Sequence, residues 1–345
     1  MDLPSLVCWR ETCAANHAQS TASLSRTLER LVSVFVSHPN ALLRLITEFR
    51  AVIGGEVALA YVRRHVPFRP RSLEVFVGRV EYEAFCRAIL SDPHLSSDVV
   101  LASDLVVGYP LCTQRDIVET LQLRLRSGLG IQVRRSSTLS PLSPVARAPC
   151  TALMNFVSPQ CFGCAYPRLT LNGRALVCDM GAGNVDHADG AARAAVVDMG
   201  MDIGNTPARW PEYCIWSPTP SNVETITACW RTDFICPGQG RYFGDAGSFV
   251  GLVAPLECGE EGKRDMRKLL FASTIVWRLS SSYRCVMRCE RRDELLPIGV
   301  TSHVITFVYG GLENLDDLSL ATGCWFSRNR GSKVHVVRRS HSAPP

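Results

Sequence analysis

Two alternating segments carry arginine and glutamine on one side and aliphatic residues on the other. In residues 121–125 and 131–134 every second position, starting from the first, is Leu, Ile or Val, and a glycine-containing stretch, 127–130, separates the two. This pattern predicts a β-hairpin. Because guanidinium groups match phosphate geometry, its polar face could hold phosphate groups without a metal, although alternating arginines are also typical of a solvated strand face. The polar face consists of Gln122, Arg124, Arg126, Gln132 and Arg134.

A single acidic residue, Glu74, lies in a third alternating segment, Ser72–Val77. Side chains two apart on a strand point the same way. A pair of carboxylates at this spacing can therefore hold metal ions against a triphosphate, where two metals activate the attacking hydroxyl and neutralise the leaving pyrophosphate. In this segment Ser72 stands two residues before Glu74, and a serine supplies no charged metal ligand.

Predicted helices surround these segments. Apolar residues recur at helical spacing before and after a Gly54-Gly55 turn, and again after the Glu74 segment. The predicted helices span about 24–35, 41–49, 56–64 and 80–90, and a further strand lies near 99–101. The fold class predicted from this order is α/β (α+β), with a small mixed sheet flanked by helices and a second α/β region behind it.

This order resembles the minimal core of the polymerase-beta-like nucleotidyltransferase superfamily. In such proteins a Gly-Ser turn grips a nucleotide phosphate, a following strand carries two acids on one face, and a later strand supplies a third. The chain is also similar to a set of fungal proteins that share this plan, over about residues 24–250. The segments that carry the similarity are Gly54-Gly55-Glu56-Val57-Ala58-Leu59, Ser72-Leu73-Glu74-Val75-Phe76-Val77, Tyr166-Pro167-Arg168-Leu169-Thr170-Leu171 and Arg241-Tyr242-Phe243-Gly244-Asp245-Ala246-Gly247-Ser248.

The residues at the metal-binding positions depart from the superfamily pattern. The resemblance places the three acids at Ser72, Glu74 and Gln132, so one carboxylate of three remains. Glu56 stands at the phosphate-gripping hydroxyl position, where its charge would repel a triphosphate. Loss of ligands from a site that works by charge neutralisation weakens transition-state stabilisation, and each ~1.4 kcal/mol lost slows the reaction about tenfold. We therefore expect transferase activity to be absent.

Three functions stay open. The leading hypothesis is a catalytically degenerate nucleotidyltransferase-like protein that binds a protein partner or a phosphate-bearing ligand and needs no cofactor. An active enzyme would need Mg²⁺ and a site rebuilt from Glu74 with another acid, Asp104 or Asp116. A nucleic-acid-binding protein would use the arginine-rich hairpin and the basic tail. Under the leading hypothesis the candidate phosphate-binding residues are Gly54, Gly55, Glu56, Arg124, Arg126 and Arg134.

Other possible signals favour structural roles. The chain has 15 cysteines, including Cys161 and Cys164. A zinc site would require a second pair at similar spacing, so buried thiols are the favoured interpretation. The glycines at 238 and 240 fit neither a P-loop nor a dinucleotide fingerprint. They favour a series of tight turns, in which Asp245 could cap a turn.

Composition predicts an ordinary globular protein. Hydrophobic residues make up 46% of the chain and charged residues 20%, which excludes a disordered profile. No apolar run is long enough for a membrane span, and the N-terminal residues lack the apolar stretch of a signal peptide. We expect a soluble intracellular protein, cytoplasmic or nuclear, that makes no membrane contact and keeps its thiols reduced.

Changes of composition along the chain predict five regions. Residues 1–20 are expected to form a flexible N-terminal arm, and residues 21–178 the nucleotidyltransferase-like core. A Gly/Ala-rich linker or loop is expected at 179–204 and a second α/β region at 205–326. Residues 327–345 are basic and are expected to form a disordered tail.

Overall fold

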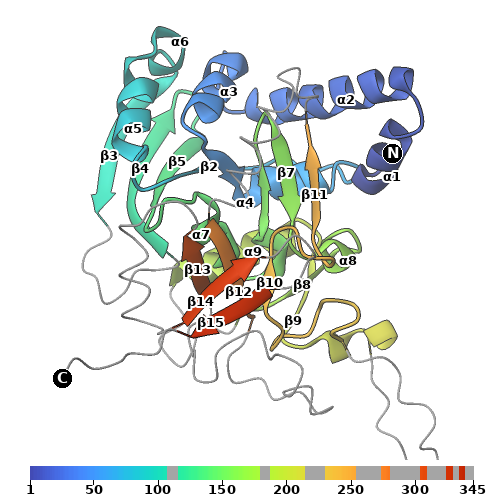
Figure 1. Ribbon diagram of the computed structural model, residues 1–345. Coiled ribbons are helices and arrows are strands. Elements are labelled where there is room, and N and C mark those ends of the chain that lie inside the picture. The colour runs from blue at the N-terminus through green and yellow to red at the C-terminus, as the bar shows by residue number, and fades with distance from the viewer. Residues whose placement is uncertain are drawn as a thin grey trace, which may run out of the picture.

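The computed structural model describes residues 1–106, 116–178, 187–213, 230–253 and 273–279, together with three short strands at 304–308, 324–328 and 334–338. The fold over these ranges is mixed α/β (α+β), with a large mixed sheet flanked by helices (Figure 1). The predicted fold class is confirmed. Of the described helices, none is long and apolar enough to cross a lipid bilayer.

An eight-stranded sheet forms the centre of the molecule, in the strand order β11-β7-β6-β1-β2-β5-β4-β3. β2 and β5 run parallel, and all other neighbours in this sheet are antiparallel. The predicted hairpin is confirmed as β4 and β5. The strands are β1 (Val52–Gly54), β2 (Ser72–Val77), β3 (Val99–Val106), β4 (Ile117–Leu125), β5 (Gly130–Ser136), β6 (Asn155–Val157), β7 (Cys161–Cys164) and β11 (Phe249–Leu252).

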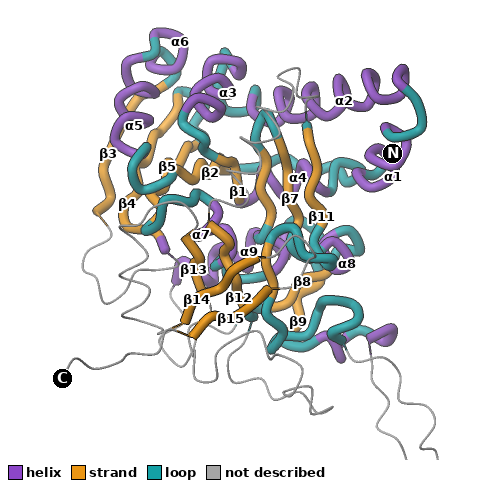
Figure 2. The backbone as a smooth tube through the Cα atoms, in the orientation of Figure 1, coloured by secondary structure: helices purple, strands orange, loops and turns teal. Residues whose placement is uncertain are grey.

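Helices cover one face of this sheet, as Figures 1 and 2 show for α2, α3 and α5. The main hydrophobic cluster joins these helices to Leu73, Val75 and Val77 of β2. Because successive strand residues point to opposite faces, Glu74 lies on the other face. The helices of this layer are α1 (Leu3–Arg10), α2 (Ala14–Val32), α3 (Pro39–Glu48), α4 (Gly55–Val62), α5 (Tyr82–Ser91) and α6 (Pro93–Ser96).

A second hydrophobic cluster lies on the opposite face. It joins Val52 and Phe76 of the main sheet to α7 (Leu142–Ala146) and to Trp277. Smaller sheets complete the described fold. They are formed by β10 (Arg241–Tyr242), β12 (Ser273–Trp277) and β13 (Val304–Val308), by β14 (Cys324–Arg328) and β15 (Val334–Arg338), and by β8 (Arg174–Leu176) and β9 (Asp202–Gly204). The short helix α8 (Pro167–Thr170) and the longer α9 (His187–Asp198) complete the described α-helices.

The N-terminal residues do not form the flexible arm that the sequence predicted. Residues 1–20 contain α1 and the start of α2. The Asp2 carboxylate accepts a hydrogen bond from the Ser5 backbone N–H at 2.8 Å and caps α1. Leu3 and Leu6 are buried in the main cluster. Two leucines over one short helix give too little periodicity to be recognised in the sequence, but their burial is sufficient to anchor the segment.

The predicted boundary after residue 178 does not separate two sheets, because β11 pairs with β7 inside the main sheet. The predicted linker at 179–204 contains α9 and β9, and β9 pairs with β8; residues 179–186 lie outside the described ranges. The predicted disordered tail at 327–345 contains the end of β14 and all of β15. Valines at 334, 336 and 337 are β-branched and favour this strand.

Candidate functional site

The residues at the predicted acid positions lie side by side on the sheet. Gly54 of β1 pairs with Glu74 of β2, and Glu74 lies opposite Gln132 of β5. Gln132 pairs in turn with Gln122 of β4. Ser72 lies on the same face as Glu74, two residues earlier on β2. The structure therefore brings Ser72, Glu74 and Gln132 together on the face opposite the main helical layer, with one carboxylate among them.

Arg134 is the charged partner of Glu74. Its Nη1 lies 3.4 Å from Oε2 of Glu74, and both side chains are largely buried, at 24% and 20% exposed. Its Nη2 donates to Oε1 of Gln132 at 2.5 Å and its Nε donates to the same oxygen at 3.2 Å. The guanidinium also lies over the Phe76 ring, 5.7 Å from its centroid. The Arg134 guanidinium, which also contacts Gln132 and Phe76, thus balances the charge of the Glu74 carboxylate.

The Glu74 carboxylate also fills the space beside the turn into α4. Gly55 has a φ of +58°, a conformation that favours glycine. A Cβ atom at Gly55 would lie 2.8 Å from Cδ of Glu74 and 3.0 Å from its Oε1. The amino end of a helix favours an anion, and here an anion of the protein itself lies next to it.

Glu56, in the first turn of α4, has a structural contact. Its Oε2 accepts a hydrogen bond from the Arg71 backbone N–H at 2.6 Å, and the residue is buried. A carboxylate in the first turn of a helix is favoured by the helix dipole. Glu56 therefore ties the segment before β2 to α4. Together with Glu74, it places two negative side chains at the turn where the sequence predicted a phosphate site.

The hairpin arginines do not form one surface. Arg124 is exposed on the same strand face as Gln122. Arg126 lies beyond the end of β4, and its Nε donates to the Ser97 carbonyl at 2.8 Å, beside α6. The prediction that Arg126 shares the polar face with Arg134 is therefore wrong. The strand alternation stops at Leu125, so it no longer sets the direction of the next side chain.

Asp116, one of the two acids considered for a rebuilt site, is engaged elsewhere. It is buried, its Oδ2 lies 3.2 Å from Nε of Arg147, and it accepts a hydrogen bond from the Ser143 hydroxyl. The next residue, Ile117, pairs with position 136, four residues beyond Gln132 on β5. Four strand residues span about 13 Å, so Asp116 does not reach Glu74.

Asp104 lies on β3, which β4 and β5 separate from β2. Three strand spacings amount to about 14 Å, and the Asp104 side chain falls outside the described residues. Within the described part of the chain, no group of three or more His, Cys, Asp or Glu side chains is arranged to hold a metal ion.

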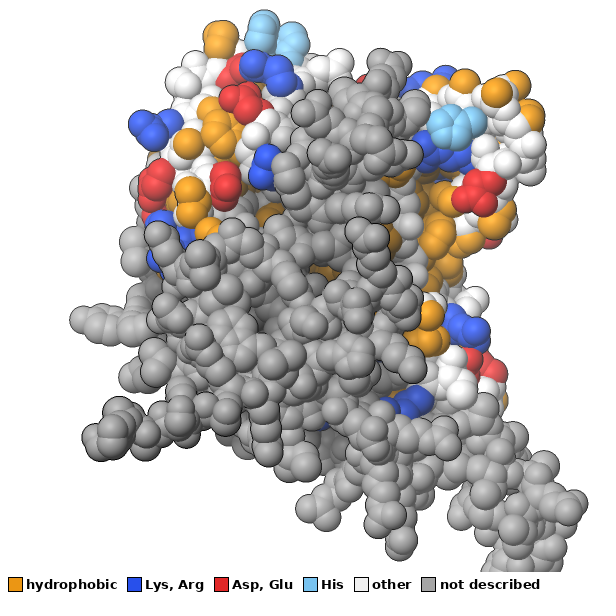
Figure 3. Space-filling model, viewed as in Figure 1, with side chains coloured by type: hydrophobic (Ala, Val, Ile, Leu, Met, Phe, Trp, Pro, Cys, Tyr) orange, Lys and Arg blue, Asp and Glu red, His pale blue; other side chains and the backbone are white. Residues whose placement is uncertain are grey.

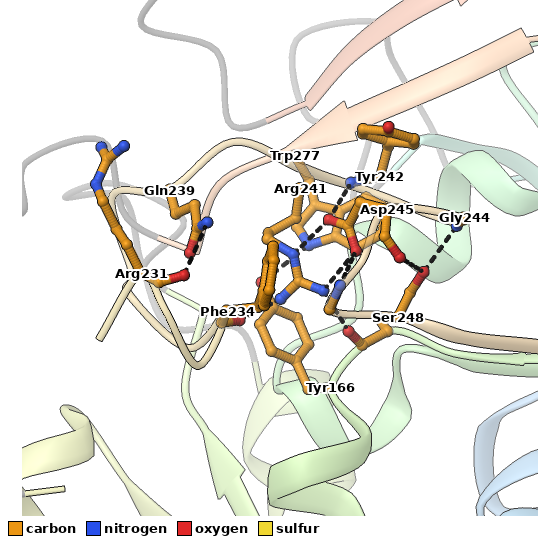
Figure 4. Close-up of polar contacts among 12 residues, drawn as sticks. Tyr166, Arg231, Phe234, Gln239, Arg241, Tyr242, Gly244, Asp245, Ser248 and Trp277 are labelled. Carbon is orange, nitrogen blue, oxygen red and sulfur yellow. Dashed lines mark hydrogen bonds and ion pairs between the residues drawn. The ribbon is translucent and has the colours of Figure 1, made fainter. Parts of the chain in front are cut away.

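The Arg241–Asp245 pair forms a buried network that sequence reasoning missed (Figure 4). Arg241 is 0% exposed; its Nε donates to Oδ2 of Asp245 at 2.5 Å and its Nη2 to Oδ1 at 3.0 Å. Nη2 also donates to the Ala165 carbonyl at 2.8 Å, and the guanidinium stacks on Tyr166 at 4.6 Å. The Tyr166 hydroxyl accepts a hydrogen bond from Nε1 of Trp277 at 3.0 Å.

This network joins β10 and the turn that follows it to the end of β7. Asp245 also accepts from the Gly247 backbone N–H at 3.0 Å, so the predicted capping role is present. For the contacts of Arg241, the sequence signal was the four-residue spacing between Arg241 and Asp245. Nothing local in the sequence showed that Arg241 would be buried. These contacts hold the fold together. They involve none of the residues that lie side by side around Glu74, namely Ser72, Glu74, Gln132 and Arg134, which are called the Glu74 row below.

Cys161 and Cys164 lie three residues apart on β7 and therefore on opposite faces. Cys161 belongs to the second hydrophobic cluster and Cys164 to the main cluster. Burial raises the pKa of the Cys161 thiol to about 11 and that of the Cys164 thiol to about 12. Both thiols are therefore protonated at neutral pH, and their opposite directions prevent them from sharing one metal ion.

Comparison with protein-family models, with curated proteins and with solved structures found no match to this chain. The function has to be inferred from the geometry of the chain itself.

Proposed function

We propose that this chain is a catalytically degenerate nucleotidyltransferase-like protein, which binds a protein partner or a phosphate-bearing ligand in the cytoplasm or nucleus without transferring a nucleotide. The observation that supports this most directly is the Glu74–Arg134 ion pair. The side chain that would have to bind metal is balanced by a guanidinium instead, and its neighbour across the strands is the neutral Gln132.

Electrostatics explains why this arrangement disfavours metal-dependent chemistry. Magnesium prefers oxygen ligands, usually including carboxylates. Glu74 supplies one negative charge, and Arg134, 3.4 Å away, cancels it. A divalent ion about 4 Å from the guanidinium would be repelled by roughly 8 kcal/mol at an effective dielectric constant of 20. The attraction between the Glu74 carboxylate and the metal ion offsets a repulsion of that size. No negative charge then remains at this position to hold a second ion.

The turn before α4 is also an unfavourable place for a nucleotide phosphate. Glu74 lies against Gly55, and Glu56 is buried in the first turn of the helix. Both carboxylates would repel a triphosphate there. A phosphate-bearing ligand of this protein would therefore bind away from the Gly54-Gly55 turn, and Arg134 is already committed to Glu74 and Gln132.

Pyrophosphate release from nucleoside triphosphates tests this proposal without requiring knowledge of the acceptor. Wild-type protein would be incubated with each of the four ribonucleoside triphosphates and Mg²⁺ or Mn²⁺, beside Glu74→Ala and Glu83→Ala. Glu83 is a matched control, since its side chain is 64% exposed on α5. We expect all three proteins to release pyrophosphate at the background rate. Metal-dependent release that persists in Glu83→Ala and is lost in Glu74→Ala would contradict the proposal.

A further inference from the structure

The corner formed by α1, α2 and α4 contains two arginines that make no ion pair with any described carboxylate. Arg10, at the end of α1, is 7% exposed, and its Nη1 donates to the Leu252 carbonyl of β11 at 2.6 Å. Arg64 follows α4, and its Nη2 donates to Oγ of Ser23 on α2 at 2.8 Å. Each guanidinium therefore has one neutral acceptor and several N–H groups left over.

Buried polar groups without a protein partner gather around these arginines. Nη1 of Arg64, the Tyr61 hydroxyl and the Ser20 hydroxyl are all buried and have no protein hydrogen-bond partner. Tyr61 and Ser20 are 0% exposed. Tyr61 lies in the last turn of α4 and Arg64 follows the end of that helix, while Ser20 is one turn from Ser23 on α2. The hydrogen bond between Arg64 and Ser23 joins the end of α4 to α2, so the unpaired groups lie on two adjoining segments.

Such groups are costly unless something satisfies them. A buried donor left unpaired destabilises the folded state, and most buried polar side chains in folded proteins have a partner. Two unpaired hydroxyls and one unpaired guanidinium nitrogen of Arg64 point to an acceptor that the protein itself does not supply. The three atoms named above all donate, or can donate, a hydrogen bond.

The electrostatics of the corner favour an anion. Burial raises the pKa of the Tyr61 hydroxyl, while the positive charges of Arg64 and Arg10 act in the opposite direction. Burial lowers the pKa of both guanidiniums, and the charge of Arg30 adds to this effect on Arg64. The acid that acts on Arg10 is Glu11, which is exposed. The carbonyl end of α4 offsets part of the positive charge, but no carbonyl accepts from Nη1 of Arg64.

We propose that this corner binds a small oxyanion of the phosphate class, held by the guanidiniums of Arg10 and Arg64 and the hydroxyls of Tyr61 and Ser20. A phosphate group accepts several hydrogen bonds at once, and the guanidinium fork matches its geometry. Basic side chains are visible at the surface of the α1–α2 corner in Figure 3. Because the two hydroxyls are fully buried, a compact group is required.

This site is separate from the Glu74 row. Glu74 lies at the amino end of α4, while Tyr61 and Arg64 lie at its carboxyl end. The eight residues of α4 span about 12 Å. The inference goes beyond the proposed function, because phosphate binding here requires neither an active nor a degenerate transferase site. Pyrophosphate release and phosphate binding can therefore fail independently.

Phosphate titrations followed by ³¹P nuclear magnetic resonance test the proposal directly. Inorganic phosphate and AMP would each be titrated at constant ionic strength into wild type, Arg64→Gln, Tyr61→Phe and Arg26→Gln. Arg26 is a matched control because it is an exposed arginine on α2, and its Nε donates to the Ala22 carbonyl of the same helix. Tyr61→Phe keeps the volume and both arginines and removes one donor.

We expect saturable binding to wild type with a dissociation constant of 1 mM or tighter, as an order of magnitude for a few charge-assisted hydrogen bonds. Arg64→Gln should weaken binding about tenfold or more, and Tyr61→Phe by several-fold, while Arg26→Gln should bind as wild type does. Tighter binding of AMP would indicate the phosphate of a small ligand, and tighter binding of inorganic phosphate a free ion. Either order supports the site.

Three results would overturn the proposal. The first is no saturable binding of either probe to wild type up to ~10 mM, which corresponds to less than about 3 kcal/mol of binding free energy. The second is unchanged binding in Tyr61→Phe and in any folded Arg64→Gln. The third is equal weakening in Arg26→Gln, which would indicate general charge attraction. If Arg64→Gln does not fold, wild type, Tyr61→Phe and Arg26→Gln still decide the question.

Discussion

Replacing Arg241 by methionine is expected to lower the free energy of unfolding by about 3–5 kcal/mol. The substitution leaves the Asp245 carboxylate, 9% exposed, without its bidentate partner. It also removes the hydrogen bond to the Ala165 carbonyl and the stacking on Tyr166. An unpaired buried charge accounts for most of the loss, because the hydrogen bonds that Asp245 keeps come from the uncharged backbone N–H groups of Tyr242 and Gly247. Urea unfolding followed by circular dichroism measures the effect.

Arg168→Met provides the matched comparison. Arg168 also pairs with an aspartate, Asp233, but its side chain is 62% exposed. An exposed pair contributes about 0–1 kcal/mol, so this variant should unfold close to wild type. If Arg168→Met and Arg241→Met lose equal stability, the buried network around Arg241 is not the anchor described above.

Gly55→Ala is expected to destabilise the protein for two separate reasons. A non-glycine residue at a φ of +58° costs about 1–2 kcal/mol. The new Cβ would also lie 2.8 Å from Cδ of Glu74, so the carboxylate and its partner Arg134 would have to shift. Gly128 separates the two effects, because it has a φ of +80° and no atom lies within 4 Å of the position that a Cβ would take there. Gly128→Ala should therefore show the backbone cost alone.

Gly55→Ala should lower the free energy of unfolding by more than Gly128→Ala does. This extra loss should disappear when Glu74 is also replaced by alanine. Urea unfolding measures the coupling free energy between Gly55→Ala and Glu74→Ala. The proteins compared are Gly55→Ala, Gly128→Ala, Glu74→Ala and the double variant Gly55→Ala/Glu74→Ala. A coupling near zero would mean that the Glu74 carboxylate does not lie against the turn. In that case the helix end would not be occupied by the protein's own carboxylate.

Local patterns predicted the elements that carry the site. Two-residue alternation identified β2, β4 and β5, and the 3.6-residue spacing of leucines identified α2. Both patterns report which face of an element is buried, so they are visible in a single sequence. α1 escaped prediction because Leu3 and Leu6 alone do not establish a period, although both are buried.

Pairings between distant segments could not be predicted in this way. A resemblance placed Glu74 and Gln132 at the acid positions of one site, but the ion pair between Glu74 and Arg134 depends on the parallel register of β2 and β5. The same limit applies to the contact of Arg241 with Ala165, 76 residues apart, and to β11, a four-residue strand that joins the main sheet. The tertiary fold alone sets these contacts, and short strands leave a weak sequence signal.

Mn²⁺ binding measured by electron paramagnetic resonance tests most directly whether Arg134, and not a metal ion, balances Glu74. Free Mn²⁺ would be counted during titration of wild type and Glu74→Ala. We predict that the two proteins bind the same amount of Mn²⁺ up to ~1 mM, a limit that corresponds to about 4 kcal/mol of binding free energy. Stoichiometric Mn²⁺ binding to wild type at micromolar concentration, lost in Glu74→Ala, would contradict this account.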